Sequence, residues 1–233
     1  MNQSKFIEEV EKLNIDITGV KLQQLEKYYE LLIEYNKVMN LTGITEKKEV
    51  YLKHFYDSLT ISKIIDLNKE QNLCDLGSGA GFPGIVLKIF YPNLKIVLID
   101  SLSKRINFLN KVIESLELKN IEAVHTRIEE YSKKNTEKFD VVTARAVAPL
   151  NILLELGISS VKVGKYFVAM KGNIKNEPSY SSSLIKLNCV QNNIIEFELP
   201  VENSKRSLIK IVKQKPTPKL FPRKYNDIKK KPL

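Results

Sequence analysis

The chain has 233 residues, of which 43% are hydrophobic, and it carries a formal net charge of +10. This length allows one sizeable core with a small extension. No apolar run approaches the roughly 18 residues of a transmembrane helix, and the N-terminus carries acidic residues where a signal peptide is apolar. The two cysteines, Cys74 and Cys189, have no partners at metal-ligand spacing. We therefore expect a cytoplasmic protein without a membrane segment or a metal site.

Helical patterns dominate the first 70 residues. Apolar residues recur at spacings of three and four over residues 22–39, which is typical of one face of a helix. A second helix is predicted from Lys47 to Ile65. His54 and Asp57 lie three positions apart on one face of that helix, where they are either substrate-pocket residues or a helix-packing pair. Residues 1–70 are therefore predicted to be an α-helical N-terminal extension.

From residue 71 onward, short apolar runs alternate with helical patterns, which indicates βαβ units and a parallel sheet. The last two runs are separated by only seven residues, Pro200 to Arg206, which is too short for a crossover helix. These runs are predicted to form an antiparallel hairpin. We expect a Rossmann-like α/β domain over residues 71–213, with a mostly parallel seven-stranded sheet. The predicted strands are Leu73–Leu76, Lys95–Asp100, Ile121–His125, Phe139–Thr143, Tyr166–Met170, Ile194–Leu199 and Ser207–Val212.

A glycine-rich loop, DLGSGAGFPG, runs from Asp75 to Gly84 after the first predicted strand. Gly77, Gly79 and Gly81 permit a tight turn and the close approach of a ligand to the backbone. The loop also contains the dinucleotide fingerprint G-x-G-x-x-G, so an NAD-dependent oxidoreductase is one alternative. Asp75, at the end of the strand, would repel a pyrophosphate and attract an ammonium or sulfonium group. This favours S-adenosylmethionine as the ligand.

Further candidate residues follow the other strands at the same edge of the sheet. Asp100 ends the second strand, where an acid can accept hydrogen bonds from both ribose hydroxyls of an adenosine cofactor. A turn residue that caps the next helix is the alternative for Asp100. Ile128 and Glu129 follow the third strand, where an apolar side chain can cover an adenine, although these residues also suit a helix start. Arg145 ends the fourth strand, where it holds the cofactor carboxylate or the target base, or else forms a surface ion pair. Candidate phosphate contacts are Lys104, Arg105 and Lys171, each alternatively a solvated charge.

The positive charge is concentrated at the C-terminal end. Residues 205–233 contain eleven Lys or Arg and a single acid, Asp227, and the rest of the chain holds equal numbers of basic and acidic residues. Each phosphate that a basic tail neutralises releases a condensed counterion, so residues 214–233 are a candidate RNA-binding tail. Its candidate contacts are Arg223 and Lys224. A merely solvated tail in a Lys-rich sequence is the alternative.

Seven segments spread along the chain together resemble the bacterial small-subunit rRNA methyltransferase G family, also called glucose-inhibited division protein B. The resemblance covers nearly the whole chain. The glycine loop alone is common to many methyltransferases, whereas the combination of segments is specific. The segments are Tyr35–Thr42, His54–Leu59, Asp75–Gly84, Asp100–Leu109, Thr143–Ala146, Met170–Gly172 and Phe221–Lys224.

The resemblance implies a class I S-adenosylmethionine-dependent methyltransferase fold. It also implies transfer of a methyl group to N7 of one guanine of 16S rRNA, at position 527 of the standard rRNA numbering, with S-adenosylhomocysteine as the product. The implied partner is 16S rRNA, the small ribosomal subunit or its assembly intermediate, and the implied state is a monomer. The cofactor-site residues that the resemblance implies are Gly77, Phe82, Ile128, Glu129 and Arg145.

The chemistry of guanine N7 is compatible with this reading. N7 carries a lone pair and no proton, so methyl transfer can depend on proximity and orientation without a general base. Residues 143–149 lack the Asn/Asp-Pro-Pro-aromatic element common in amine methylation, and neither cysteine lies at a strand-end loop, as methylation at pyrimidine C5 requires. The alternatives left open are a methyltransferase acting on another RNA or on a small molecule, and an RNA-binding module with a vestigial cofactor loop.

Overall fold

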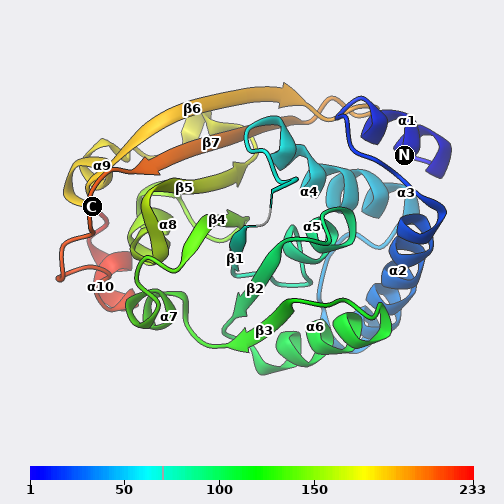
Figure 1. Ribbon diagram of the computed structural model, residues 1–233, viewed down its shortest axis with the longest axis horizontal. Helices are drawn as coiled ribbons and strands as arrows, with labels where there is room; N and C mark the ends of the chain where they lie inside the picture. Colours follow the sequence, from blue (N-terminus) through cyan, green and yellow to red (C-terminus); the bar gives the residue numbers. More distant parts are fainter. Residues whose placement is uncertain (70) are drawn as a thin grey trace.

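A seven-stranded sheet forms the centre of the computed structural model, which describes residues 1–69 and 71–233 (Figure 1). The strands are β1 (Asn72–Leu76), β2 (Lys95–Asp100), β3 (Ile121–His125), β4 (Phe139–Arg145), β5 (Val161–Lys171), β6 (Cys189–Glu198) and β7 (Lys205–Lys213). Their order is β3-β2-β1-β4-β5-β7-β6, in which β1 to β5 are parallel and β7 is antiparallel to both β5 and β6. The predicted sheet and its terminal hairpin are confirmed.

The central strands are apolar because helices cover both faces of the sheet. In β1 every residue from Leu73 to Leu76 is buried, including Asp75. The strand order reverses at β1: β2 and β3 lie on one side of β1, and the chain then returns to place β4 on its other side. In open α/β sheets, ligands bind at the carboxyl edge beside such a switch point. The glycine loop after β1 therefore lies where a ligand site is expected.

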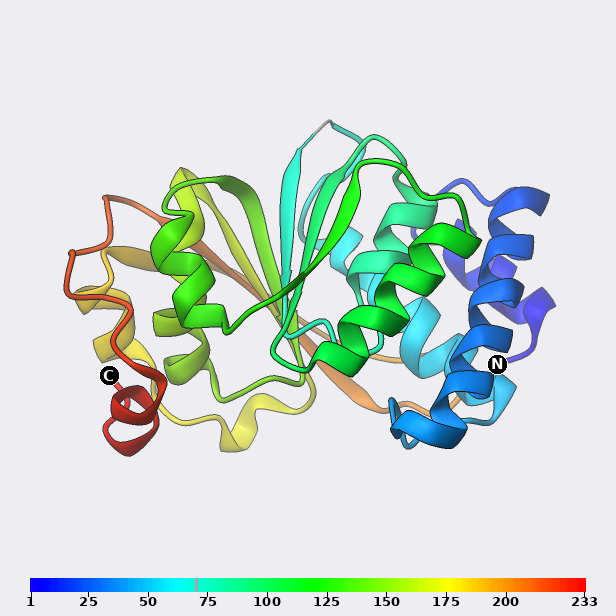
Figure 2. The same ribbon diagram turned by 90° about the horizontal axis from the view of Figure 1, so that it is seen from below.

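Two groups of helices flank the sheet (Figure 2). On one face α5 and α6 share a core with the N-terminal helices, and on the other face α7 and α8 form a second core with the sheet. The helices are α1 (Gln3–Glu11), α2 (Gly19–Met39), α3 (Lys47–Glu49), α4 (Asp57–Leu59), α5 (Gly84–Phe90), α6 (Ser103–Ser115), α7 (Ile128–Lys134), α8 (Leu150–Gly157), α9 (Ser181–Lys186) and α10 (Tyr225–Lys230).

The second predicted N-terminal helix is a continuous helical segment that changes its winding. It starts as α3, passes through a π-helical stretch at Val50–Tyr56, continues as α4 and ends in a 3₁₀ turn at Thr60–Lys63. Expected to reach Ile65, it ends two residues earlier. A π-helical stretch changes the direction of the side chains that follow it and is frequent at functional sites. Glu70, the last residue of the predicted N-terminal extension, lies outside the described residues.

The basic tail folds back onto the domain through buried contacts. Arg223 donates from Nε and Nη2 to the two carboxylate oxygens of Glu155 on α8, at 2.7 and 2.6 Å, and its backbone N–H donates to the same carboxylate. Glu155 and Ile228 of α10 are both fully buried. The tail therefore packs beside α8 (Figure 1).

Within residues 1–69 and 71–233, no helix combines the length and the apolar character needed to cross a membrane. The same residues contain no group of three or more His, Cys, Asp or Glu side chains arranged to hold a metal ion.

We predict that Arg223→Ala lowers the free energy of unfolding by about 3 kcal/mol, because it leaves the Glu155 carboxylate buried without its cation. Urea unfolding followed by circular dichroism measures this loss. Lys224→Ala, which changes the exposed neighbouring cation, is the control. Equal stabilities of the two variants would contradict the anchoring role of Arg223.

Candidate active site

The glycine loop takes the left-handed conformation that only glycine adopts freely. Gly77, Gly79 and Gly81 have φ values of +67°, +58° and +98°. A Cβ at Gly77 would lie 2.8 Å from a methyl group of Val147, and one at Gly81 would lie 2.6 Å from the Tyr28 hydroxyl. The loop therefore packs closely against Val147 at one end and Tyr28 at the other. The backbone of Gly77 lines a cavity.

Asp75 lies beneath the loop and not at its rim, which corrects the expectation from the sequence. Its side chain is fully buried, and its Oδ2 accepts a hydrogen bond of 2.9 Å from the backbone N–H of Gly84, the first residue of α5. Its Oδ1 has no hydrogen-bond partner among the residues that the structure describes. Burial raises the pKa of Asp75 to about 7. Asp75 thus positions the loop against α5.

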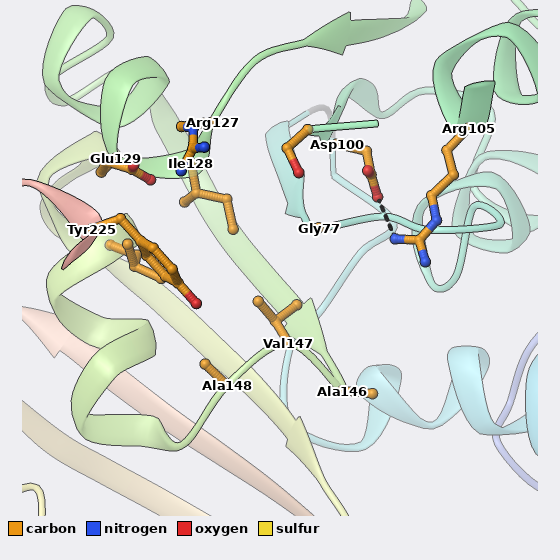
Figure 3. A pocket seen from close by; sticks show the side chains of 12 residues that line it. Gly77, Asp100, Arg105, Arg127, Ile128, Glu129, Ala146, Val147, Ala148 and Tyr225 are labelled. Atoms are coloured by element: carbon orange, nitrogen blue, oxygen red, sulfur yellow. Dashed lines mark hydrogen bonds and ion pairs between the residues drawn. The ribbon is translucent and has the colours of Figure 1, made fainter. Parts of the chain in front are cut away.

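A first cavity of about 340 Å³ opens beside the loop at the carboxyl ends of β1, β2, β3 and β4 (Figure 3). This volume lies within the range of small-molecule sites. Four residues proposed as cofactor contacts line it, namely Gly77, Asp100, Ile128 and Glu129. Its complete wall is Gly77, Asp100, Ser101, Arg105, Arg127, Ile128, Glu129, Ala146, Val147, Ala148, Leu156 and Tyr225.

Asp100 connects the loop to the start of α6. Its Oδ2 accepts from the backbone N–H of Gly79 at 3.0 Å and from Nη1 of Arg105 at 3.2 Å, and its Oδ1 accepts from the backbone N–H of Leu102 at 2.9 Å. Arg105, expected as a phosphate contact, is thus an ion-pair partner of Asp100 in the cavity wall. Lys104 points to solvent in the first turn of α6.

A second cavity of about 300 Å³ adjoins the first, and Ala146 lines both. Its wall includes Lys53, His54, Asp57, Arg145, Ala146, Lys171 and Arg206. Arg145, for which the resemblance implies a cofactor contact, lines this second cavity. Its Nη1 donates to the carbonyl of Lys53 at 2.8 Å and to Asp57 Oδ2 at 3.1 Å. The other oxygen of Asp57 accepts from Nε of Arg206 at 3.1 Å. Asp57 is therefore held between two arginines.

His54 is fixed beside Arg145 by stacking and hydrogen bonding. Its ring stacks on Phe82 with centroids 4.4 Å apart, and its Nε2 lies 2.9 Å from the Thr42 hydroxyl. Burial, and secondarily the guanidinium of Arg145, lowers the pKa of His54 to about 3. His54 is therefore neutral at pH 7. Phe82, for which the resemblance implies a cofactor contact, is buried behind His54 among other aromatic rings.

The remaining candidate cations differ in their surroundings. Lys171 lines the second cavity, where its Nζ donates to the carbonyl of Ala148 at 2.7 Å and to Glu177 Oε1 at 2.9 Å. Arg223 turns inward to Glu155, whereas Lys224 is exposed. Sequence reasoning missed Tyr225 in the first cavity and Arg206 in the second. The only signal for Tyr225 was that an aromatic residue interrupts the basic tail.

We predict that replacing Asp75 with Asn makes stability less dependent on pH. The raised pKa of Asp75 means that the folded state holds a proton that the unfolded state loses, so the wild type loses stability as pH rises from about 4 to about 7. The unfolding free energy of Asp75→Asn minus that of the wild type should therefore increase by about 2–3 kcal/mol between pH 5 and 8. Urea titrations at several pH values measure it. A difference that stays constant with pH would contradict a buried titrating carboxyl.

Comparison of the sequence with known proteins identifies its relatives. A family model described as rRNA small subunit methyltransferase G matches residues 21–203. Proteins named Ribosomal RNA small subunit methyltransferase G from Macrococcus caseolyticus and Bacillus licheniformis are 45% and 46% identical to this chain, over 100% of the chain and 99% of each relative. These matches extend well beyond the glycine loop.

Similar solved structures show the fold. A SAM dependent methyltransferase from Aquifex aeolicus has a TM-score of 0.55 at 16% identity, covering 74% of this chain and 97% of that chain. The TYW2 protein of P. horikoshii, solved in complex with MeSAdo, has a TM-score of 0.52 at 10% identity, covering 67% and 61%. The fold is that of the class I methyltransferases, and the sequence matches establish that this chain belongs to the rRNA small subunit methyltransferase G family.

Proposed function

We propose that this protein transfers a methyl group from S-adenosylmethionine, bound in the first cavity, to N7 of a guanine of 16S rRNA held in the second. The observation that carries this proposal is the contact between the two cavities at Ala146, at the carboxyl edge of the sheet. A donor in one cavity and an acceptor base in the other would meet at that residue. The names of the relatives supply the substrate class.

The first cavity suits an adenosine-bearing cation. Asp100 offers carboxylate oxygens to ribose hydroxyls, Ile128 offers an apolar surface to adenine, and Gly77 allows the ligand to approach the backbone. When bound, S-adenosylmethionine supplies a methyl group on a sulfonium sulfur, and its transfer leaves S-adenosylhomocysteine. The cofactor contacts that we propose from the structure are therefore Gly77, Asp100, Ile128 and Glu129.

The second cavity suits a guanine attached to a phosphate backbone. Four cations line it, each paired with a carboxylate of the protein, and Asp57 places a buried acceptor in its wall. The cations are Lys53, Arg145, Lys171 and Arg206. Guanine presents N–H donors on its pairing edge and a free lone pair at N7. His54 and Asp57 are the side chains of this wall that can accept a proton, and both are held by other residues. Because guanine N7 has no proton to lose, its methylation does not require a free base in this wall.

The proposed partner is 16S rRNA, alone or within the small subunit or its assembly intermediate, and the proposed setting is the cytoplasm, with the protein as a monomer. Lys104 and Lys224 are exposed and are the proposed phosphate contacts outside the two cavities. Arg223 is not, because Glu155 holds its guanidinium.

The reaction is tested by comparing 16S rRNA from cells with and without this protein, using strand cleavage selective for N7-methylguanosine. We expect one cleavage site to disappear when the protein is removed and to return when it is supplied again. Identical cleavage at every guanine in the two samples would contradict the substrate assignment.

A variant of Arg145 distinguishes binding of the target base from binding of the cofactor. We predict that Arg145→Lys lowers kcat/KM for rRNA by about 100-fold, since lysine cannot reproduce the planar contacts to Lys53, Asp57 and the Phe82 ring that fix the wall of the second cavity. Calorimetric affinity for S-adenosylhomocysteine should stay within about twofold, because Arg145 does not line the first cavity. Lys133→Ala, an exposed cation on α7, is the control. Loss of S-adenosylhomocysteine binding in Arg145→Lys would show that Arg145 acts on the cofactor.

A further inference from the structure

The C-terminal segment forms part of the wall of the first cavity. Tyr225, the first residue of α10, lines this cavity together with Gly77 and Asp100, although the chain between them passes through most of the sheet. Figure 3 shows Tyr225 on the same side as Ile128 and Glu129, across the cavity from Asp100 and Arg105. A residue of the basic tail therefore faces the proposed cofactor.

We propose that the segment Phe221–Leu233 completes the cofactor site, with Tyr225 contacting the nucleoside part of S-adenosylmethionine. This inference rests on the proposed function, because it requires an adenosine ligand in the first cavity. It assigns to the tail a role in cofactor binding in addition to the RNA contact expected from its charge.

The segment is anchored on both sides of Tyr225. Before it, Arg223 is fixed to the buried carboxylate of Glu155 on α8. After it, Ile228 is fully buried, and the carbonyl of Leu233 accepts a hydrogen bond of 3.2 Å from the Ser183 hydroxyl. A further hydrogen bond of 2.9 Å, from Nη2 of Arg223 to the carbonyl of Lys231, closes the segment on itself. These contacts hold Tyr225 at the cavity.

The chemistry of Tyr225 suits an adenosine. The hydroxyl of Tyr225 has no hydrogen-bond partner among the described residues, so it is available to a polar atom of a ligand. Its ring offers a flat apolar surface of the kind on which purines stack. Ile128 approaches the cavity from the same side (Figure 3). If Asp100 binds the ribose, the base extends from it toward Ile128 and Tyr225.

Calorimetric titration with S-adenosylhomocysteine and with methylthioadenosine tests this contact. We expect Tyr225→Ala to weaken both ligands by about threefold to tenfold, because both contain the nucleoside. Tyr225→Phe separates the ring from the hydroxyl and should retain most of the affinity if stacking dominates. Asn226→Ala, an exposed neighbour outside the cavity wall, is the matched control and should bind as the wild type does.

Two further measurements distinguish contact from a general structural role. The thermal midpoint of Tyr225→Ala should match that of Asn226→Ala, and KM for S-adenosylmethionine should rise while kcat at saturating cofactor stays unchanged. Equal S-adenosylhomocysteine affinity of Tyr225→Ala and the wild type would overturn this inference alone. Failure of the wild type to bind S-adenosylhomocysteine would overturn the proposed function together with it.

Discussion

The carboxylate of Asp100 holds together the strand ends between which the first cavity opens. It accepts hydrogen bonds from the loop after β1 and from the start of α6, and it pairs with Arg105 in the cavity wall. Because β1 and β2 are adjacent and parallel, a single acid at the end of β2 reaches the glycine loop directly. The loop and the cavity wall are therefore fixed relative to one another before any ligand binds, which reduces the ordering cost of binding.

A second acid, Asp57, connects parts of the molecule that are far apart in sequence. It links the N-terminal helical segment to β4 through Arg145 and to β7 through Arg206. The N-terminal helices and the antiparallel hairpin thus both contribute to the wall of the second cavity. In the sequence, the N-terminal extension and the terminal hairpin lie at opposite ends of the Rossmann-like domain. In this protein they meet over the end of β4, where the two cavities adjoin.

The sequence predicts the strands more accurately than it predicts where individual side chains point. β2 and β3 match their predicted bounds because each is an apolar run that ends at a turn. β5 and β6 each begin five residues before their predicted start, at Val161 and Cys189, where apolar and polar residues mix. Asp100 and Ile128 line the first cavity, at strand ends that the pattern predicts. Asp75 was misplaced, because position along a strand does not reveal which acid is covered by the following helix. The inward turn of Arg223 depends on a partner 68 residues away, which local patterns do not contain.

The C-terminal residues 205–233, which carry the excess positive charge, show why charge alone does not identify an RNA-binding arm. Several of their cations form hydrogen bonds and ion pairs with groups of the protein itself. Lys213 is fully buried and donates to the carbonyls of Ser159 and Val161, Arg206 holds Asp57, and Arg223 holds Glu155. Only the cations that remain exposed, such as Lys224, can release counterions from RNA. The net charge of the segment therefore overstates the charge that it offers to RNA, and its inward-facing residues position both cavities.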